Sequence, residues 1–437
     1  MLVREAKLKP FSSAAQFGAL DEAIRTAQCV RNRCLKHWME NRGTSKNDLQ
    51  RLCAVLAQDA EQPWMKKLNA HARQASAEKA WQSVANFYRR CKSGEKEKGF
   101  PKFKKHSRSV EYKVSGYKLS DDAQQIKFTD GFEAGSFDLW MDSDARRLIA
   151  SSKLNRVRVV RRADGYYAQF CLDIERIEAG EYTGSVAGID LGLKYFIKDS
   201  KGSEVECPKY YRKMQKRLRM AQRRLCKKFR RTKKGEKKQR QSSNYHKQRV
   251  VVGRIHLKIQ RQRKDFALKT ARCVVKSNDL VAYEDLNVAG LVRNSHLSKS
   301  ISDAGWSTFR NWLEYYGKLW SKVVVAVNPA YTTQDCSGCG YRARKSLSTR
   351  THSCSRCGLE MCRDENAALN ILKKGMEKAG MEYQNSSEGH SQTGSRVVGT
   401  TTPTERTTGK MNTSGLLEQS NNLSVVAEPV RECSDAS

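Results

Sequence analysis

The spacing of apolar and polar positions divides the first half of the chain into two kinds of segment. From residue 13 to 94, apolar residues recur every three or four positions, as at Phe17, Leu20 and Ile24, which predicts helices. After residue 95 the period shortens to two, and RVRVVRRADGYYAQFCLDI predicts two strands joined by an Asp-Gly turn. The start, LVREAKLK, also alternates. We therefore expect a helical domain and a small β-domain that includes the N-terminal strand.

Two apolar runs after residue 182 each end in acids. VAGID predicts a buried strand ending at Asp190, DLVAYED predicts another ending at Glu284, and DENAALNILKK predicts a helix opened by Asp364. Between the strands, 16 of the 30 residues from 211 to 240 are Lys or Arg, with apolar residues at a helical interval. A second basic helix is expected at 245–276, so the two would form a helical arm.

The charge of the chain points to a polyanionic partner. The 437 residues carry 82 Lys and Arg against 46 Asp and Glu, a net charge of +36, and the basic run has one acid in 30 residues. So many positive charges repel one another unless an anionic partner neutralises them. We therefore expect the basic run to contact nucleic acid rather than to be only a solvent-exposed helix surface.

Composition also bears on the cell compartment and on order. No run of 18 apolar residues exists to span a membrane and no signal peptide is evident, so we expect a soluble, intracellular protein. Ten of the 14 cysteines are isolated, which favours a reducing compartment and no disulfide framework. The stretch 385–437 is rich in Ser, Thr, Asn and Gly and is expected to be disordered.

Four cysteines have the spacing of a structural metal site. They form two Cys-x-x-Cys pairs, each followed by a glycine, at Cys336, Cys339, Cys354 and Cys357. Two tight turns can present these four thiolates to one tetrahedral Zn²⁺. A site closed by four thiolates has no open position for a substrate, so this zinc would be structural.

The three acids suggest a second kind of metal site. If Asp190, Glu284 and Asp364 meet in the fold, their oxygens could hold two Mg²⁺ ions. Each acid alone has a simpler explanation, since carboxylates are common at strand ends and at helix N-termini, where the helix dipole favours them.

Taken together, these motifs resemble one family. GIDLG, YEDL, the paired cysteines and RDENAALNI are similar to the RuvC-like nuclease of the TnpB (OrfB) proteins of insertion sequences, relatives of the type V CRISPR effectors. GFPKFKK, the basic arm and SISDAGW extend the resemblance over about residues 1–375. It implies an α/β RNase H-like (RuvC) nuclease with an inserted zinc ribbon, a β-barrel wedge domain and a helical recognition domain. The implied boundaries are 1–12 and 95–182 for the wedge, 13–94 for recognition, 183–330 and 360–380 for the nuclease with its arm at 208–276, and 331–359 for the zinc ribbon.

The resemblance implies an RNA-guided DNA endonuclease associated with a transposon, cutting target DNA next to a short motif. Its partners would be guide RNA and target DNA, with no membrane, and we expect a monomer with one RNA in the cytoplasm, at the nucleoid of a prokaryote. Asp190, Glu284 and Asp364 would form the catalytic triad and hold Mg²⁺. The expected nucleic-acid contacts are Gln74, Lys216, Arg219, Arg223 and Lys227. The family often has Asp-Arg-Asp where this chain has Cys362 in the first position, which leaves the third acid in place.

Three alternatives to this interpretation remain open. A nuclease-inactive, RNA-guided repressor would have no need to keep three acids. A transposase that joins DNA ends itself needs a Ser or Tyr nucleophile, or a different acid triad, and no motif marks one. A compact CRISPR-associated effector would use the same chemistry, and a repeat array beside the gene would identify it.

Overall fold

The computed structural model of the chain describes residues 2–10, 15–174, 178, 180–231, 239–346 and 349–381. The chain divides into two compact units, residues 1–176 and 177–437. The segment 385–437, expected to be disordered, lies outside the described residues, as do residues 232–238 of the basic arm. Within the described residues, every helix is too short or too polar to cross a membrane.

Three helices and a 3-10 turn form one half of the first unit: α1 (Ala15–Glu40), α2 (Lys46–Ala57), η1 (Pro63–Lys67) and α3 (Ala70–Lys92). The start of α2 is fixed by a capping box, in which Ser45 and Asp48 satisfy each other's backbone amides. Apolar faces of the four elements meet around fully buried Val30, Leu49 and Met65.

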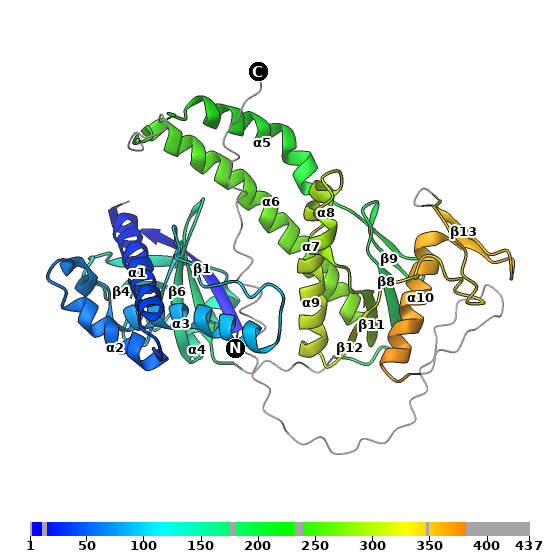
Figure 1. Cartoon of the computed structure of the whole chain (residues 1–437), viewed down its shortest axis with the longest axis horizontal. Coiled ribbons are helices and arrows are strands. Elements are labelled where there is room, and N and C mark those ends of the chain that lie inside the picture. Colours follow the sequence, from blue (N-terminus) through cyan, green and yellow to red (C-terminus); the bar gives the residue numbers. More distant parts are fainter. Residues whose placement is uncertain are drawn as a thin grey trace, which may run out of the picture. The chain divides into compact units, whose positions relative to one another are not determined.

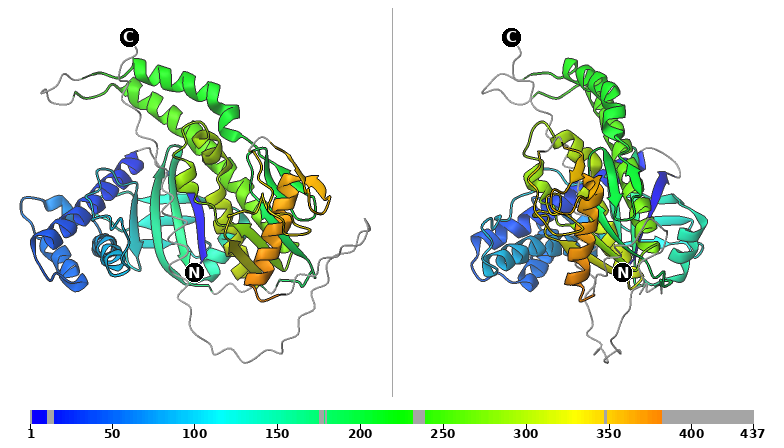
Figure 2. Two further views of the ribbon diagram at one scale, coloured as in Figure 1. Left: turned by 45° about the vertical axis from the view of Figure 1, so that its right-hand side comes forward. Right: turned by 90° about the vertical axis from the view of Figure 1, so that its right-hand side faces the viewer.

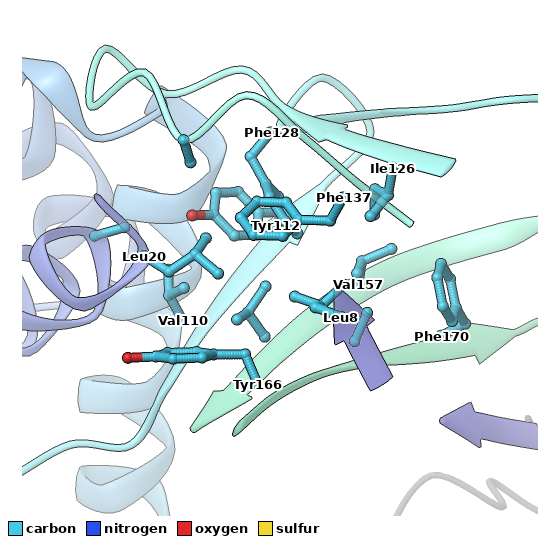
Figure 3. Close-up of a cluster of buried hydrophobic side chains, with 14 of the residues drawn as sticks. Leu8, Leu20, Val110, Tyr112, Ile126, Phe128, Phe137, Val157, Tyr166 and Phe170 are labelled. Atoms are coloured by element: carbon cyan, nitrogen blue, oxygen red, sulfur yellow. The ribbon is translucent and has the colours of Figure 1, made fainter. Parts of the chain in front are cut away.

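A seven-stranded antiparallel sheet forms the other half of this unit, in the order β2-β6-β7-β1-β5-β4-β3. The N-terminal strand lies inside it, paired with β7 on one side and β5 on the other. Tyr112, Phe128 and Phe137 form its aromatic core, and Leu20 of α1 packs against them (Figure 3). The strands are β1 (Leu2–Pro10), β2 (Ser109–Lys113), β3 (Tyr117–Leu119), β4 (Gln125–Phe128), β5 (Ser136–Trp140), β6 (Leu154–Arg162) and β7 (Gly165–Leu172), with the short helix α4 (Ser143–Ser151) before β6.

A five-stranded sheet is the centre of the second unit, in the order β10-β9-β8-β11-β12. β8, β11 and β12 run parallel, and β9 is antiparallel to β8. Alternate residues of β11 face opposite sides: Leu280 packs with α10, whereas Val281 packs with α6 and α9. The elements are β8 (Val186–Asp190), β9 (Tyr195–Asp199), β10 (Glu204–Glu206), β11 (Leu280–Glu284), β12 (Val323–Val327), α9 (Trp306–Leu319) and α10 (Arg363–Lys378).

The basic arm is a pair of helices, α5 (Tyr210–Lys227) and α6 (Ser243–Lys276), that extends beyond the strands of its own unit (Figures 1 and 2). The base of the arm is anchored by buried Asp303 of α8 (Ser298–Ala304), which accepts hydrogen bonds from the backbone N–H of Tyr211 and from Arg263 of α6. α5 has no side-chain cap of its own, so Asp303 supplies the missing acceptor. The remaining described elements are α7 (Val288–Leu291), β13 (Thr351–Ser353) and β14 (Glu360–Cys362).

Candidate metal centre and carboxylate site

The first two predicted acids lie at the ends of neighbouring parallel strands. β8 ends at Asp190 and β11 ends at Glu284, and the register pairs the preceding residues, Ile189 and Tyr283. Parallel neighbours in register end at the same edge of a sheet, so the two carboxylates start from adjacent backbone positions. In open α/β sheets this carboxyl edge is where ligands bind.

Helix α10 brings the third acid to the same edge. Asp364 lies in its first turn, and the helix packs directly on β8. A Cβ on Gly188 would overlap the carbonyl oxygen of Ala368, so only glycine allows this close approach. The carboxylates of Glu284 and Asp364 both act electrostatically on Asp190. The fold therefore brings together three acids that are far apart in the sequence.

The environment of Asp190 and Glu284 opposes their ionisation. Burial, followed by the charges of Glu284 and Asp364, raises the pKa of Asp190 to about 7. Burial also raises the pKa of Glu284, although a hydrogen bond from Thr332 acts in the opposite direction. A cation at this edge would offset the repulsion, and a set of carboxylate oxygens suits a divalent cation that prefers oxygen ligands.

Asp364 is held by arginine. The Nε and Nη2 groups of Arg363 donate to its Oδ1 at 3.1 and 3.0 Å, and Arg350 Nη1 lies 3.8 Å from its Oδ2. Binding one cation with all three acids would require Asp364 to exchange some of these contacts. Across the described part of the chain, the four cysteines alone form a group of three or more Cys, His, Asp or Glu residues gathered closely enough to bind a metal.

The four predicted cysteines meet at one point. Their sulfur atoms all lie within 4.8 Å of one another, with Cys336 and Cys357 Sγ 3.6 Å apart and Cys339 and Cys354 Sγ also 3.6 Å apart. The two glycines that follow the pairs, at positions 340 and 358, have φ of +73° and +71°, and each donates its N–H back to the first cysteine of its pair at 2.9 Å. This geometry fits one tetrahedral metal ion.

Cys362 is separate from this cluster. It ends β14, is exposed, and occupies the N-cap position of α10. The metal-binding group contains the four paired cysteines without it. The spacing argument that favoured the two pairs therefore agrees with the geometry.

Thr332 was not anticipated from the sequence. Its buried hydroxyl donates to Glu284 Oε1 at 2.5 Å, and its backbone carbonyl accepts a hydrogen bond from Asn370 Nδ2 at 2.9 Å. A threonine just ahead of a cysteine pair is an ordinary turn residue, so no sequence pattern marked it. Its contacts link the second acid to α10, the helix that carries the third.

Asn366 adds a second link between α10 and the cysteine cluster. Its Oδ1 accepts from the N–H of Ser337 at 2.9 Å, and its Nδ2 donates to the carbonyl of Asp335 at 2.8 Å. Asn366 is fully buried and lies two residues after Asp364. The segment leading into Cys336 is therefore bonded to the helix that bears the third acid.

The predicted nucleic-acid contacts lie on two elements. Lys216, Arg219, Arg223 and Lys227 are exposed on α5, at intervals that place them on one helical face. That face is opposite to Leu218 and Leu225, which pack against α6. Gln74 is half-buried on α3, in the first unit. Their contacts with nucleic acid stay predictions.

Two family models match the chain. The OrfB_IS605 model, described as a probable transposase, matches residues 169–295, and the Cas12f1-like TNB domain model matches residues 306–371. Over residues 169–295 the chain is thus similar to the OrfB (TnpB) family. The first match contains Asp190 and Glu284, and the second contains Asp364 and the four cysteines, so the two matched segments together include the three acids and the cysteine cluster.

Two similar proteins come from bacteria. A Streptomyces pristinaespiralis protein named as a candidate RNA-guided DNA endonuclease is 32% identical over 234 residues, which are 53% of this chain and 56% of that protein. InsQ of Escherichia coli K12, named in the same way, is 28% identical over 333 residues, 72% of this chain and 77% of that protein. The match thus spans little more than half the length of the Streptomyces relative.

The fold of this chain resembles that of a solved CRISPR effector. Cas12f1, in a complex with single-guide RNA and target DNA, aligns with a TM-score of 0.50 over 83% of each chain. The sequence identity is 14%, so the likeness concerns the fold alone.

Proposed function

We propose that this chain is an RNA-guided DNA endonuclease of an insertion sequence that cuts target DNA beside a short motif. The observation that carries the proposal is that Asp190, Glu284 and Asp364 gather at one sheet edge in a chain that matches the OrfB model. The names of the Streptomyces and Escherichia relatives and the fold similarity to Cas12f1 support it.

The three carboxylates are the proposed ligands of Mg²⁺. Bound Mg²⁺ would lower the pKa of the attacking water and stabilise the leaving oxygen of a phosphodiester. Asp190 and Glu284 offer oxygens from adjacent strand ends, and the hydroxyl of Thr332 fixes the orientation of Glu284. Asp364 completes the set when it exchanges its contacts with Arg363.

The cysteine cluster is the proposed site of a structural Zn²⁺. Four thiolates fill a tetrahedral shell and leave no position for water or substrate. The ion would instead hold the two turns together and so fix the segment that Asn366 joins to α10.

Guide RNA and target DNA are the proposed partners, with one protein chain for each RNA. The guide would supply sequence specificity by base pairing, while its phosphates contact the basic face of α5. The seven-stranded sheet would belong to the β-barrel wedge (1–12 and 95–182) and the helices of the first unit to the recognition domain (13–94), with Gln74 reading the short motif. The second unit would contain the RuvC nuclease and its zinc ribbon. The bacterial relatives favour action on DNA in the cytoplasm of a prokaryote.

The decisive experiment compares two acid variants of the complex purified with its copurifying RNA, whose sequence defines the target. Asp190→Ala should abolish Mg²⁺-dependent cleavage and leave RNA binding intact. Asp285→Asn is the matched control, because Asp285 follows Glu284 but is exposed and paired with Arg310; it should still cleave. Normal cleavage by Asp190→Ala would refute the carboxylate site. A wild-type complex that binds its target without cutting would instead support the repressor.

A further inference from the structure

A loop with an unusual surface connects α3 to β2 in the first unit. Residues 99–108, GFPKFKKHSR, form neither a helix nor a strand, and β2 begins at the next residue, Ser109. The loop carries four Lys or Arg residues and no acid. It also exposes two large apolar side chains, Phe100 and Phe103, with 53% and 51% of their surface accessible. Neither the carboxylate site nor the cysteine cluster uses this loop.

Side chains of α1 hold the middle of the loop in one conformation. Asn32 bonds Lys104 twice: its Oδ1 accepts from the N–H at 3.0 Å and its Nδ2 donates to the carbonyl at 2.9 Å. Gln28 Nε2 donates to the carbonyls of Lys104 and Lys105 at 2.9 and 3.0 Å. An irregular backbone bonded by side chains in this way loses little further entropy when it binds a ligand.

The start of the loop is fixed from α3. Arg90 donates from Nε to the carbonyl of Lys98 at 2.6 Å and from Nη2 to that of Gly99 at 2.9 Å. Gly99 has φ of +58°, and a Cβ there would lie 3.4 Å from Arg90 Nη2. The backbone just before the exposed phenylalanines is therefore held against α3.

Phe100 is the outer member of an aromatic cluster. Its ring lies 5.3 Å from Phe87 and 5.7 Å from Trp38, and Trp38 in turn contacts Tyr88 edge-on at 6.0 Å. Tyr88 has 51% of its surface exposed. Inner rings thus support outer rings that remain accessible, and apolar surface of this kind marks an interaction site.

The charge around these rings identifies the occupant. The exposed cations of the loop are Lys102, Lys104, Lys105 and Arg108. A partner that suits both cations and flat apolar faces combines negative charge with accessible aromatic faces. Unpaired nucleic acid has both, because its phosphates contact Lys and Arg while its bases stack on aromatic side chains. A duplex keeps its bases stacked inside and could use only the cations.

We propose that the loop and its aromatic cluster bind an unpaired DNA strand. The inference rests on the proposed function, because pairing of a guide with one DNA strand releases the other unpaired. The loop carbonyls of Gly99, Lys104 and Lys105 are already bonded to side chains of α1 and α3, which leaves fewer acceptors for a ribose 2′-hydroxyl. The surface contacts base faces and phosphates, both of which DNA provides.

The test measures binding of a labelled oligothymidine to the full chain, without guide RNA and in Mg²⁺-free buffer so that the strand stays intact. The variant Phe100→Leu with Phe103→Leu keeps apolar side chains and removes both rings. It should bind the oligothymidine at least tenfold more weakly, since each base stacked on an aromatic side chain contributes about five- to 160-fold. Trp140→Leu is the matched control: Trp140 is 62% exposed on β5, outside the loop, and its variant should bind as the wild type does.

Two further measurements test whether the loop itself contacts the DNA strand. Photocrosslinking of a bromouracil-substituted strand should label the peptide carrying Phe100 and Phe103. If the double variant unfolds, Lys102→Gln with Lys105→Gln should still reduce the log-log salt slope by about 1.4, or about 0.7 for each lost contact to a single strand. Equal binding by the double variant and the Trp140 control, an equal loss for duplex DNA, or a larger loss for RNA than for DNA would overturn the proposal. Because neither guide nor cleavage is involved, failure of the endonuclease proposal would be seen separately.

Discussion

Replacing Thr332 by Val tests whether the hydroxyl beside Glu284 positions a cation ligand. Valine has nearly the same shape, so the change removes the 2.5 Å hydrogen bond and leaves the volume in place. A hydrogen bond to an ionised group contributes about 1.5–3 kcal/mol. Loss of a partner that orients a metal ligand typically weakens metal binding by about 10- to 100-fold. We therefore expect the Mg²⁺ concentration for half-maximal cleavage to rise by about that factor.

The assay titrates Mg²⁺ against the rate of target cleavage by the RNA-loaded complex. At saturating Mg²⁺ the rate of the Val variant should recover most of its wild-type value, because Asp190 and Glu284 are both still present. Thr332→Ser keeps the hydroxyl and should show nearly the wild-type Mg²⁺ dependence. A folded Val variant with an unchanged Mg²⁺ requirement would refute the positioning argument. A low rate that no Mg²⁺ concentration restores would show that Thr332 acts on the fold instead.

Three other changes have distinct expected results. Cys339→Ser should lower the zinc content measured by elemental analysis and reduce cleavage, whereas Cys362→Ser, outside the cluster, should retain zinc; an intact wild-type protein without zinc would contradict this. Replacing Lys216, Arg219, Arg223 and Lys227 by Gln should reduce the salt slope for the copurifying RNA by about three units, and an equal reduction for an unrelated RNA of the same length would leave α5 a general polyanion surface. In Mg²⁺-free buffer the pKa of Asp190 is about 7 in the folded chain and near 3.8 in the unfolded chain, so between these pH values the folded chain holds a proton that the unfolded chain has released. Stability should therefore fall as pH rises between these values, by at most about 4 kcal/mol. Asp190→Asn should flatten that slope in urea unfolding, and an unchanged slope would contradict the burial argument.

Local pattern was sufficient to predict the strands and the helix that carry the acids. VAGID and LVAYE are apolar runs, and both are strands that end at the expected carboxylates, Asp190 and Glu284. The basic helix expected at 245–276 is α6, which begins at Ser243. Periodicity succeeds here because each of these elements buries a continuous apolar face.

The spacing of apolar and polar residues could not predict contacts between residues that are distant in the sequence. Val110 and Tyr112 alternate as a half-buried strand should, yet Glu111 between them is only 3% exposed. Burial alone would raise the pKa of Glu111, but the charges of Lys79, Arg158 and Arg156 hold it at about 2. Those cations come from α3 and β6, so no local window around Glu111 could reveal them.

The same limit applies to the arginines around Asp364. RDENAALNI marks the acid, and its neighbour Arg363 is visible in the sequence, but the direction of the guanidinium is set by the fold. The carbonyl of Thr349 accepts from Arg363 Nη1 at 2.9 Å and so helps to hold the side chain in place. Residue types marked the three acids as predicted metal ligands, whereas the hydrogen bonds that Asp364 accepts from Arg363 are visible only in the structure.

The position of the cysteine cluster next to the third acid has a physical consequence for the second acid. The segment from Thr332 to Ser337 enters the cluster at Cys336 and has its backbone bonded by Asn366 and Asn370 of α10. Its first residue, Thr332, bonds Glu284. The segment is thus held at one end by the cysteine cluster and at the other by a carboxylate of the sheet, with α10 bonded between. Loosening the cluster would free the segment before it disturbed β8, so loss of the proposed structural metal should act on the proposed carboxylate site first through Glu284 and only later through Asp190.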